Sequence, residues 1–224
     1  MDIHTVGVTM NGLGKFLIFI SRLGVVFYSM FIVACTSSLP DLPTATVHPS
    51  LTKNISDYSY LIGPGDSLNV FVWGNSEVSG TYKVRPDGMI TTSLVEDIHA
   101  SGKTPTQLAR EIEAKLANYV RQPIVSVIVD GFVGPFSEQV RVIGEASEPK
   151  AISYTKNMTL LDAMIQVGGL TEYANGNNAS LIRVVNGKQV QYGLNIDELL
   201  EDGNIKANVD LLPGDIIIIP ESWF

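Results

Sequence analysis

Adjacent acidic residues are the first candidates for chemistry in this chain. Glu96-Asp97 and Glu201-Asp202 could each contribute to the carboxylate pair that glycoside hydrolysis requires. That chemistry depends on the distance between two carboxylates in space, and adjacent acids in a loop are more often a solvated turn. The sequence contains no G-x-S-x-G, Walker A, G-x-G-x-x-G or H-E-x-x-H motif. We therefore expect no catalytic residues and no enzymatic activity.

Aromatic and histidine side chains are the other candidates for a site. Four aromatic residues could stack on sugar rings, namely Trp73, Tyr82, Tyr154 and Tyr173. For Trp73, which ends an apolar strand, a place in the core is the favoured interpretation. His48 and His99 are far apart in sequence, and neither has a cysteine or another histidine beside it. No metal and no cofactor is therefore expected.

Cys35 is the only cysteine of the chain. It follows Arg22 and the uncharged apolar run Leu23–Ala34, the pattern of a secretory signal. The four residues ending at Cys35 resemble the lipobox of bacterial lipoproteins, which implies cleavage before Cys35 and a lipid on its sulfur. Thr36, rather than Asp, favours sorting to the outer membrane. The alternative is a permanent membrane anchor, but a span of about 20 residues would include Arg22.

Charge and composition limit the classes of partner and fold. The formal net charge is −8, and lysine and arginine form no cluster, which argues against nucleic acid as a partner. A single cysteine cannot form an intramolecular disulfide, so stability must come from a hydrophobic core, and 45% of the residues are hydrophobic. Residues 35–224 are enough for one large or two small domains.

The first folded unit is expected to begin at Tyr58, because residues 35–57 are rich in proline and show no periodicity. Turn, strand and helix signals then follow in order: the turn Gly63-Pro64-Gly65-Asp66, a strand Leu68–Trp73, the turn Pro86-Asp87-Gly88, a helix Thr104–Val120 and a strand Ile124–Val129. Thr104 and Gln107 predict a capping box at the start of the helix. The nearly continuous apolar run of the last strand predicts burial on both faces.

A second unit follows with its own set of signals. They predict a strand Gln139–Ile143, a helix Leu160–Val167 capped by Thr159 and ended by Gly168-Gly169, a hairpin with strands Ser180–Val185 and Lys188–Tyr192, a helix from a capping Asn195 to Leu200, and a buried strand Ile216–Ile219. The turn Pro213-Gly214-Asp215 opens the last strand and repeats Pro64-Gly65-Asp66. Since Pro-Gly turns are common, coincidence is the favoured interpretation of this repeat. Together the two units predict an α+β fold.

The order and spacing of these segments resemble the bacterial outer-membrane polysaccharide export proteins, the Wza-like family. In the first unit the resemblance is carried by Tyr60 to Asp66, Val84 to Ile90, Gly102 to Pro105 and Gln122 to Val127. In the second it is carried by Val140 to Glu145, Thr159 to Ala163, Gly168 to Thr171, and Leu212 to Ile216 with Pro220. Gly168 to Arg183 and the last five residues look closest to short members found beside exosortase-type exopolysaccharide loci.

The resemblance implies a domain order and a function. A signal peptide (1–34) and a tether (35–57) precede a polysaccharide-export domain (58–136) and an SLBB-type β-grasp domain (137–224). The implied function is a lipid-anchored, non-catalytic ring on the periplasmic face of the outer membrane, which conducts a polysaccharide together with an inner-membrane polysaccharide co-polymerase. The matched turn residues are assigned to architecture, not to sugar contact: Gly63, Pro64, Gly65, Asp66, Pro86, Asp87, Gly88, Gly168, Gly169, Pro213, Gly214 and Asp215.

Two expectations about assembly complete the sequence-based interpretation. Longer members of the family continue into an amphipathic helix that forms a pore, whereas only four residues follow Pro220 here. The resemblance therefore implies transfer of the polymer to a separate outer-membrane β-barrel. The alternative to the whole interpretation is a monomeric envelope lipoprotein that binds a soluble ligand or a cell-wall glycan through its β-grasp domain. A defined ring would distinguish the export component from that monomer.

Overall fold

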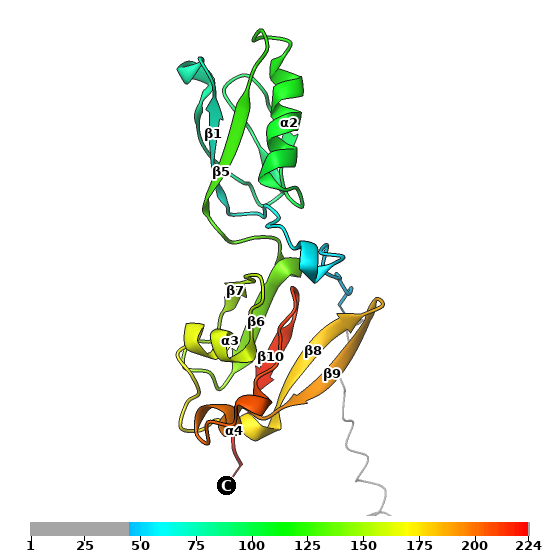
Figure 1. Cartoon of the computed structure of the whole chain (residues 1–224), viewed down its shortest axis with the longest axis vertical. Helices are drawn as coiled ribbons and strands as arrows, with labels where there is room; N and C mark the ends of the chain where they lie inside the picture. The colour runs from blue at the N-terminus through cyan, green and yellow to red at the C-terminus, as the bar shows by residue number, and fades with distance from the viewer. Residues whose placement is uncertain (1–44, 224) are drawn as a thin grey trace, which may run out of the picture. The chain divides into compact units, whose positions relative to one another are not determined.

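A computed structural model describes residues 45–223 of the chain (Figure 1). The predicted signal peptide, Cys35 and the first part of the predicted tether lie outside the described residues. No helix among residues 45–223 has the length and apolar character that a membrane span needs. The described residues form sheets with a few short helices, which confirms the α+β class.

The first domain is built on a three-stranded antiparallel sheet. Its strands are β1 (Ser67–Val72), β2 (Gly80–Lys83) and β5 (Val125–Gly131), in the order β2-β1-β5. Helix α2 (Pro105–Leu116) packs against β5 (Figure 1). A separate pair is formed by β3 (Met89–Ile90) and β4 (Ile98–His99), and two short 3-10 helices, η1 (Ile55–Asp57) and η2 (Ser76–Val78), lie in the loops.

The core of this domain forms where the apolar face of a strand, with every second residue buried, and the apolar face of a helix, with a period of 3.6 residues, contribute to one cluster. Strand β1 buries Leu68, Val70 and Val72, and helix α2 buries Leu108, Ile112 and Leu116. The predicted capping box at Thr104 and Gln107 is present, with both reciprocal hydrogen bonds. The helix ends at Leu116 rather than Val120, and beyond it the N–H groups of Tyr119 and Val120 share the Leu116 carbonyl.

The predicted burial of the last strand of this domain is wrong. Strand β5 alternates, and Ile124 and Ile128 are 61% and 55% exposed. Only one face of the three-stranded sheet is covered, so Ser126, Ile128 and Asp130 of β5 point to solvent. A continuous apolar run reports hydrophobicity but does not report which faces other elements will cover.

The second domain is a five-stranded mixed sheet in the order β7-β6-β10-β8-β9. The strands are β6 (Gln139–Gly144), β7 (Ala151–Ser153), β8 (Ala179–Val185), β9 (Lys188–Leu194) and β10 (Ile216–Ile219), and only the β6–β10 pair is parallel. Helices α3 (Leu160–Gln166) and α4 (Ile196–Leu200) and the 3-10 helices η3 (Phe136–Glu138), η4 (Gly176–Asn178) and η5 (Ile205–Ala207) complete it.

Local signals placed most elements of this domain correctly. Asn186 and Gly187 have φ of 51° and 74°, as a type I′ hairpin requires, and they join β8 to β9. Thr159 caps α3, and Gly168 and Gly169, at φ of 76° and 81°, follow its end. The predicted cap at Asn195 is wrong in one respect, because its side chain makes no capping hydrogen bond.

Candidate functional site: two Pro-Gly-Asp turns beside one linker

The first Pro-Gly-Asp turn is closed by its own aspartate. The Asp66 N–H donates to the Gly63 carbonyl at 3.2 Å, and the Gly63 N–H donates to Asp66 Oδ2 at 2.9 Å. Gly65 lies at φ of 94°, in the left-handed region where glycine carries no Cβ penalty. Pro64 fixes φ at the preceding position. The turn delivers the chain directly into β1.

The second turn repeats this arrangement at the start of β10. The Asp215 N–H donates to the Leu212 carbonyl at 3.2 Å, the Leu212 N–H donates to Asp215 Oδ2 at 2.7 Å, and Gly214 has φ of 90°. The repeated sequence therefore has the same local structure at both places, and whether the repeat is a coincidence stays open. Both segments form the same turn, with the same carboxylate oxygen bound to the same backbone position.

Both aspartates are buried, and each finds a different set of further partners. Asp66 is 0% exposed, and its Oδ1 accepts the N–H groups of Val133 at 2.7 Å and Gly134 at 3.1 Å. The Tyr60 hydroxyl donates to Asp66 Oδ2 at 2.6 Å. Burial, and after it the hydrogen bond to Asp66, raises the pKa of Tyr60 well above its ordinary value, so the phenol remains a donor.

Asp215 is paired with a cation instead. Arg183 on β8 donates Nε to Oδ1 at 2.9 Å and Nη2 to Oδ2 at 2.7 Å, a bidentate arrangement. Asp215 is 1% exposed. The hydrogen bonds to Asp215 raise the pKa of Arg183. Burial of a carboxylate without such partners costs free energy, and both turns supply the partners.

Both turns also approach one segment, Phe132–Glu138, which we call the linker because it joins β5 to β6. A Cβ added to Gly63 would lie 1.9 Å from the Gly134 carbonyl carbon, and one added to Gly214 would lie 2.7 Å from the Ser137 carbonyl oxygen. These distances are too short for any side chain, so glycine is required at both positions. The linker is therefore held by the Asp66 carboxylate and by close backbone contact with both turns.

The remaining turn residues are divided between this site and the surface. Pro86 lines a pocket of about 610 Å³ together with Pro64, Gly65 and the linker residue Phe136. Asp87 lies outside that pocket, where it accepts Arg85 Nη2 at 2.7 Å in an exposed ion pair. That pairing lowers the pKa of Asp87. Gly168 and Gly169 end helix α3 and belong to the second domain.

Glu138 is a buried residue of the linker that no sequence motif singles out. It is 5% exposed, and its carboxylate accepts the Ser50 hydroxyl at 2.9 Å, the Leu51 N–H and the Thr52 hydroxyl at 2.6 Å. We call residues 50–57 the strap. Since the strap makes these contacts, the prediction of an extended tether as far as residue 57 is wrong for this part. The partners are 86 to 88 residues apart in sequence, so no local pattern could reveal them.

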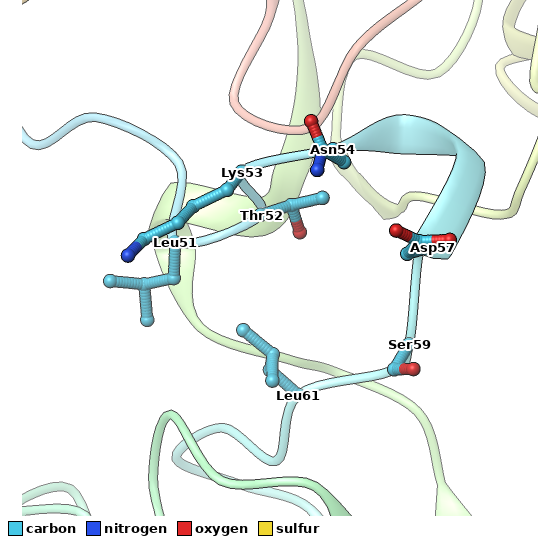
Figure 2. Close-up of a pocket in the computed structure, with 7 residues that line it drawn as sticks. All are labelled: Leu51, Thr52, Lys53, Asn54, Asp57, Ser59 and Leu61. Atoms are coloured by element: carbon cyan, nitrogen blue, oxygen red, sulfur yellow. The ribbon is translucent and has the colours of Figure 1, made fainter.

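The strap also partly encloses a small pocket. This pocket has a volume of about 240 Å³. Figure 2 shows Leu61 and Asp57 directed into it and the Lys53 ammonium directed away. Beyond the strap, the Tyr58 hydroxyl donates to the Tyr154 carbonyl at 3.0 Å. Burial, with a smaller contribution from Glu138, raises the pKa of Tyr58 to about 12. The pocket holds no pair of groups suited to acid–base chemistry.

The other sequence candidates lie apart from these turns. Asp97 is exposed and paired with Arg85 at 2.9 Å, and Glu201 and Asp202 are exposed. Tyr154 is buried, whereas Trp73 is 69% exposed, so its predicted place in the core is wrong. No group of histidine, cysteine, aspartate and glutamate residues suited to a metal ion occurs in residues 45–223.

A three-stranded antiparallel sheet with one helix packed on it, joined to a small five-stranded mixed-sheet domain, defines a two-domain α+β protein. Residues 54–130 match the family described as "Polysaccharide biosynthesis/export protein", and residues 138–219 match the SLBB domain. The chain belongs to the polysaccharide export proteins in which these two domains follow each other. This family consists of transport components, in agreement with the expectation that the chain is not an enzyme.

Individual relatives carry related names. The chain is 30% identical over 202 residues to the EPS I polysaccharide export outer membrane protein EpsA of Ralstonia nicotianae, covering 79% of this chain and 50% of that protein. It is 33% identical over 130 residues to the exopolysaccharide production protein ExoF of Rhizobium meliloti, covering 52% and 30%. It is 26% identical over 160 residues to the polysialic acid transport protein KpsD of Escherichia coli, covering 71% and 28%. The chain thus spans half or less of these relatives.

Proposed function

We propose that this chain is a lipid-anchored, ring-forming component of a conduit that exports a polysaccharide across the envelope. The observation that carries the proposal is the pair of matched domains with a linker held between two turns of the same construction. Repeated copies can close a ring through head-to-tail contacts only if each copy presents its two domains in one fixed relation. The buried contacts of Asp66 and the close approach at Gly63 and Gly214 restrict the conformation of the linker, and with it the relation between the two domains.

In this proposal the twelve turn residues act as architecture. Their carboxylates bind backbone N–H groups, the Tyr60 hydroxyl, Arg85 or Arg183, and a glycan would bind elsewhere. Lipidation of Cys35 would hold the ring at the periplasmic face of the outer membrane. The proposed partners are the polysaccharide, further copies of this chain, an inner-membrane polysaccharide co-polymerase and a separate outer-membrane β-barrel. No enzymatic step is part of the proposal.

Two measurements on whole cells and purified protein test the proposal. We expect the detergent-extracted protein to have the mass of a defined oligomer, and Cys35→Ser to leave the protein unprocessed and absent from the outer-membrane fraction. The matched control is Thr36→Ser, which keeps the cysteine and should fractionate normally. A strict monomer with its lipid intact would favour the alternative of a ligand-binding lipoprotein. Normal fractionation of Cys35→Ser would refute the anchor.

A further inference from the structure

The uncovered face of the β2-β1-β5 sheet carries an unusual set of side chains. Phe71 and Trp73 on β1 and the loop after it are 45% and 69% exposed, and their rings meet edge to face at a centroid distance of 6.3 Å. Ile124 and Ile128 lie on the neighbouring strand or at its start, 61% and 55% exposed. We call these four residues with their polar neighbours Asn69, Thr81 and Ser126 the open face.

The strand register places polar and apolar side chains side by side on the open face. Thr81, Asn69 and Ile128 lie in one row across the three strands, and Phe71 pairs with Ser126 in the next. The Trp73 N–H donates to the Ile124 carbonyl at 2.9 Å, which sets a third row. Within residues 45–223, the side chains of Asn69, Thr81 and Ser126 make no hydrogen bond, so their donors and acceptors face outward.

Area and charge restrict what can bind to the open face. The four apolar side chains present on the order of 500 Å², whereas a stable interface between proteins needs about 800 Å² on each partner. The three rows contain no charged side chain; Lys83 and Asp130 lie beyond them, towards Ser67. A membrane surface rich in anionic lipid selects a basic face, which this is not.

A segment of glycan matches the chemistry of the open face. The C–H faces of sugar rings are apolar and carry slight positive charge, which suits the negative faces of aromatic rings. The hydroxyl groups at the edges of the same rings need amide and hydroxyl partners of the kind that Asn69, Thr81 and Ser126 supply. Residues alternate along one face of a strand at roughly 6.7 Å, so the rows from Asn69 to Trp73 cover roughly 13 Å, the length of a short oligosaccharide.

We propose that the open face is where the exported polysaccharide contacts this chain, with Trp73 and Phe71 stacking on sugar rings. This inference rests on the proposed function and assigns it a surface. The contact is weak and repeated: each copy binds a short stretch of polymer, and the polymer can leave one copy and meet the next. Sugar contact thereby falls to the open face and not to the Pro-Gly-Asp turns.

The chain contains two tryptophans, Trp73 and Trp223, which gives the experiment its own control. In Trp223→Phe the tryptophan fluorescence comes from Trp73 alone, and in Trp73→Phe it comes from Trp223, which is 91% exposed. Both full-length variants are titrated with short oligosaccharides cut from the polysaccharide that the source cells secrete. We expect a saturable change in the Trp223→Phe protein only, and Phe71→Ala in that background should weaken binding about tenfold.

Three results would overturn the inference. The first is a Trp73 signal that follows protein concentration and ignores the oligosaccharide, which would mark a contact between copies. The second is a signal that appears only after reconstitution into vesicles of phosphatidylethanolamine and phosphatidylglycerol, which would mark a membrane contact. The third is no response to any of these probes while circular dichroism shows an intact fold.

Export in cells separates this inference from the proposed function. Deletion of the gene should abolish secretion of the polysaccharide, and the double substitution Phe71→Ala with Trp73→Ala should reduce it while the protein level stays normal. Trp223→Ala is the matched control and should export normally. If the deletion blocks export but the double substitution does not, the open face is wrongly assigned and the proposed function stands. If the deletion has no effect, the proposed function fails.

Discussion

Single buried carboxylates decide how the two turns are built. Asp66 is satisfied by three N–H groups and one hydroxyl, without a cation, whereas Asp215 is satisfied by Arg183 and one N–H group. The backbone N–H donors around Asp66 are fixed in the fold and cannot turn to solvent when the carboxylate is replaced. A substitution of Asp66 therefore leaves more buried donors without an acceptor than a substitution of Asp215. The stability of the first turn thus depends on its aspartate in a different way from the stability of the second.

Asp66→Asn is expected to lower the free energy of unfolding by about 2–4 kcal/mol. The amide keeps one acceptor oxygen but directs an NH₂ group at N–H or O–H donors that remain buried. Urea unfolding followed by circular dichroism measures the change, with the exposed Asp202→Asn as a control that should leave the midpoint unchanged. A midpoint for Asp66→Asn that equals that of the control would contradict the importance of these four hydrogen bonds.

At the scale of helices and strands, the sequence correctly predicted those features that depend on residues close together in the chain. The capping boxes at Thr104 and Thr159 and the Asn186-Gly187 hairpin depend on residues within a few positions, and all three are present. The exposure of the outer face of β5 and of Trp73 was predicted wrongly. Burial depends on which element packs against a surface, and the residues that make such contacts are far apart in sequence. The Glu138 contacts with the strap were missed for the same reason.

Helix α3 should depend on pH through its cap. It has seven residues, and the Asp162 carboxylate accepts the Thr159 N–H at 2.9 Å and the Thr159 hydroxyl at 2.8 Å. These hydrogen bonds lower the pKa of Asp162. A lowered pKa in the folded state means that the carboxylate stabilises the protein above its ordinary pKa, and that this contribution is lost as pH falls through the folded value.

Asp162→Asn should therefore unfold at a lower temperature than the parent at neutral pH, and the difference should shrink as the pH falls below about 4. Thermal unfolding at a series of pH values measures it. Asp202→Asn again serves as control, since it should show no pH-dependent difference of this kind. A difference between Asp162→Asn and the parent that stays constant with pH would show that the cap acts without its charge.

At the scale of the whole molecule, the strap joins the N-terminal segment to the linker. Three consecutive residues bind the single Glu138 carboxylate, and Lys156 Nζ donates to the Ser56 carbonyl at 2.6 Å. The strap lies at the N-terminal edge of the export domain in sequence, yet these hydrogen bonds go to the linker and the second domain. A fragment that starts at residue 58 would lack all of them.

Glu138→Gln should free the strap, because an amide replaces one acceptor oxygen by a donor that faces the Thr52 or Ser50 hydroxyl or the Leu51 N–H. We expect trypsin to cleave after Lys53 roughly tenfold faster, since local opening exposes that bond more often. The exposed Glu148→Gln is the matched control and should be cleaved at the parent rate. Equal rates for both variants would mean that other contacts hold the strap.

The docked strap has a mechanical consequence. A pull on the N-terminal segment is transmitted first to the Glu138 carboxylate, before it reaches the ladder of either sheet. A few hydrogen bonds would give way at low force and reform when the load falls, and each released residue would add roughly 3.5 Å of slack. In the proposed lipid-anchored protein, the strap would then release and rebind reversibly, so that the N-terminal attachment lengthens under load while both domain cores stay folded.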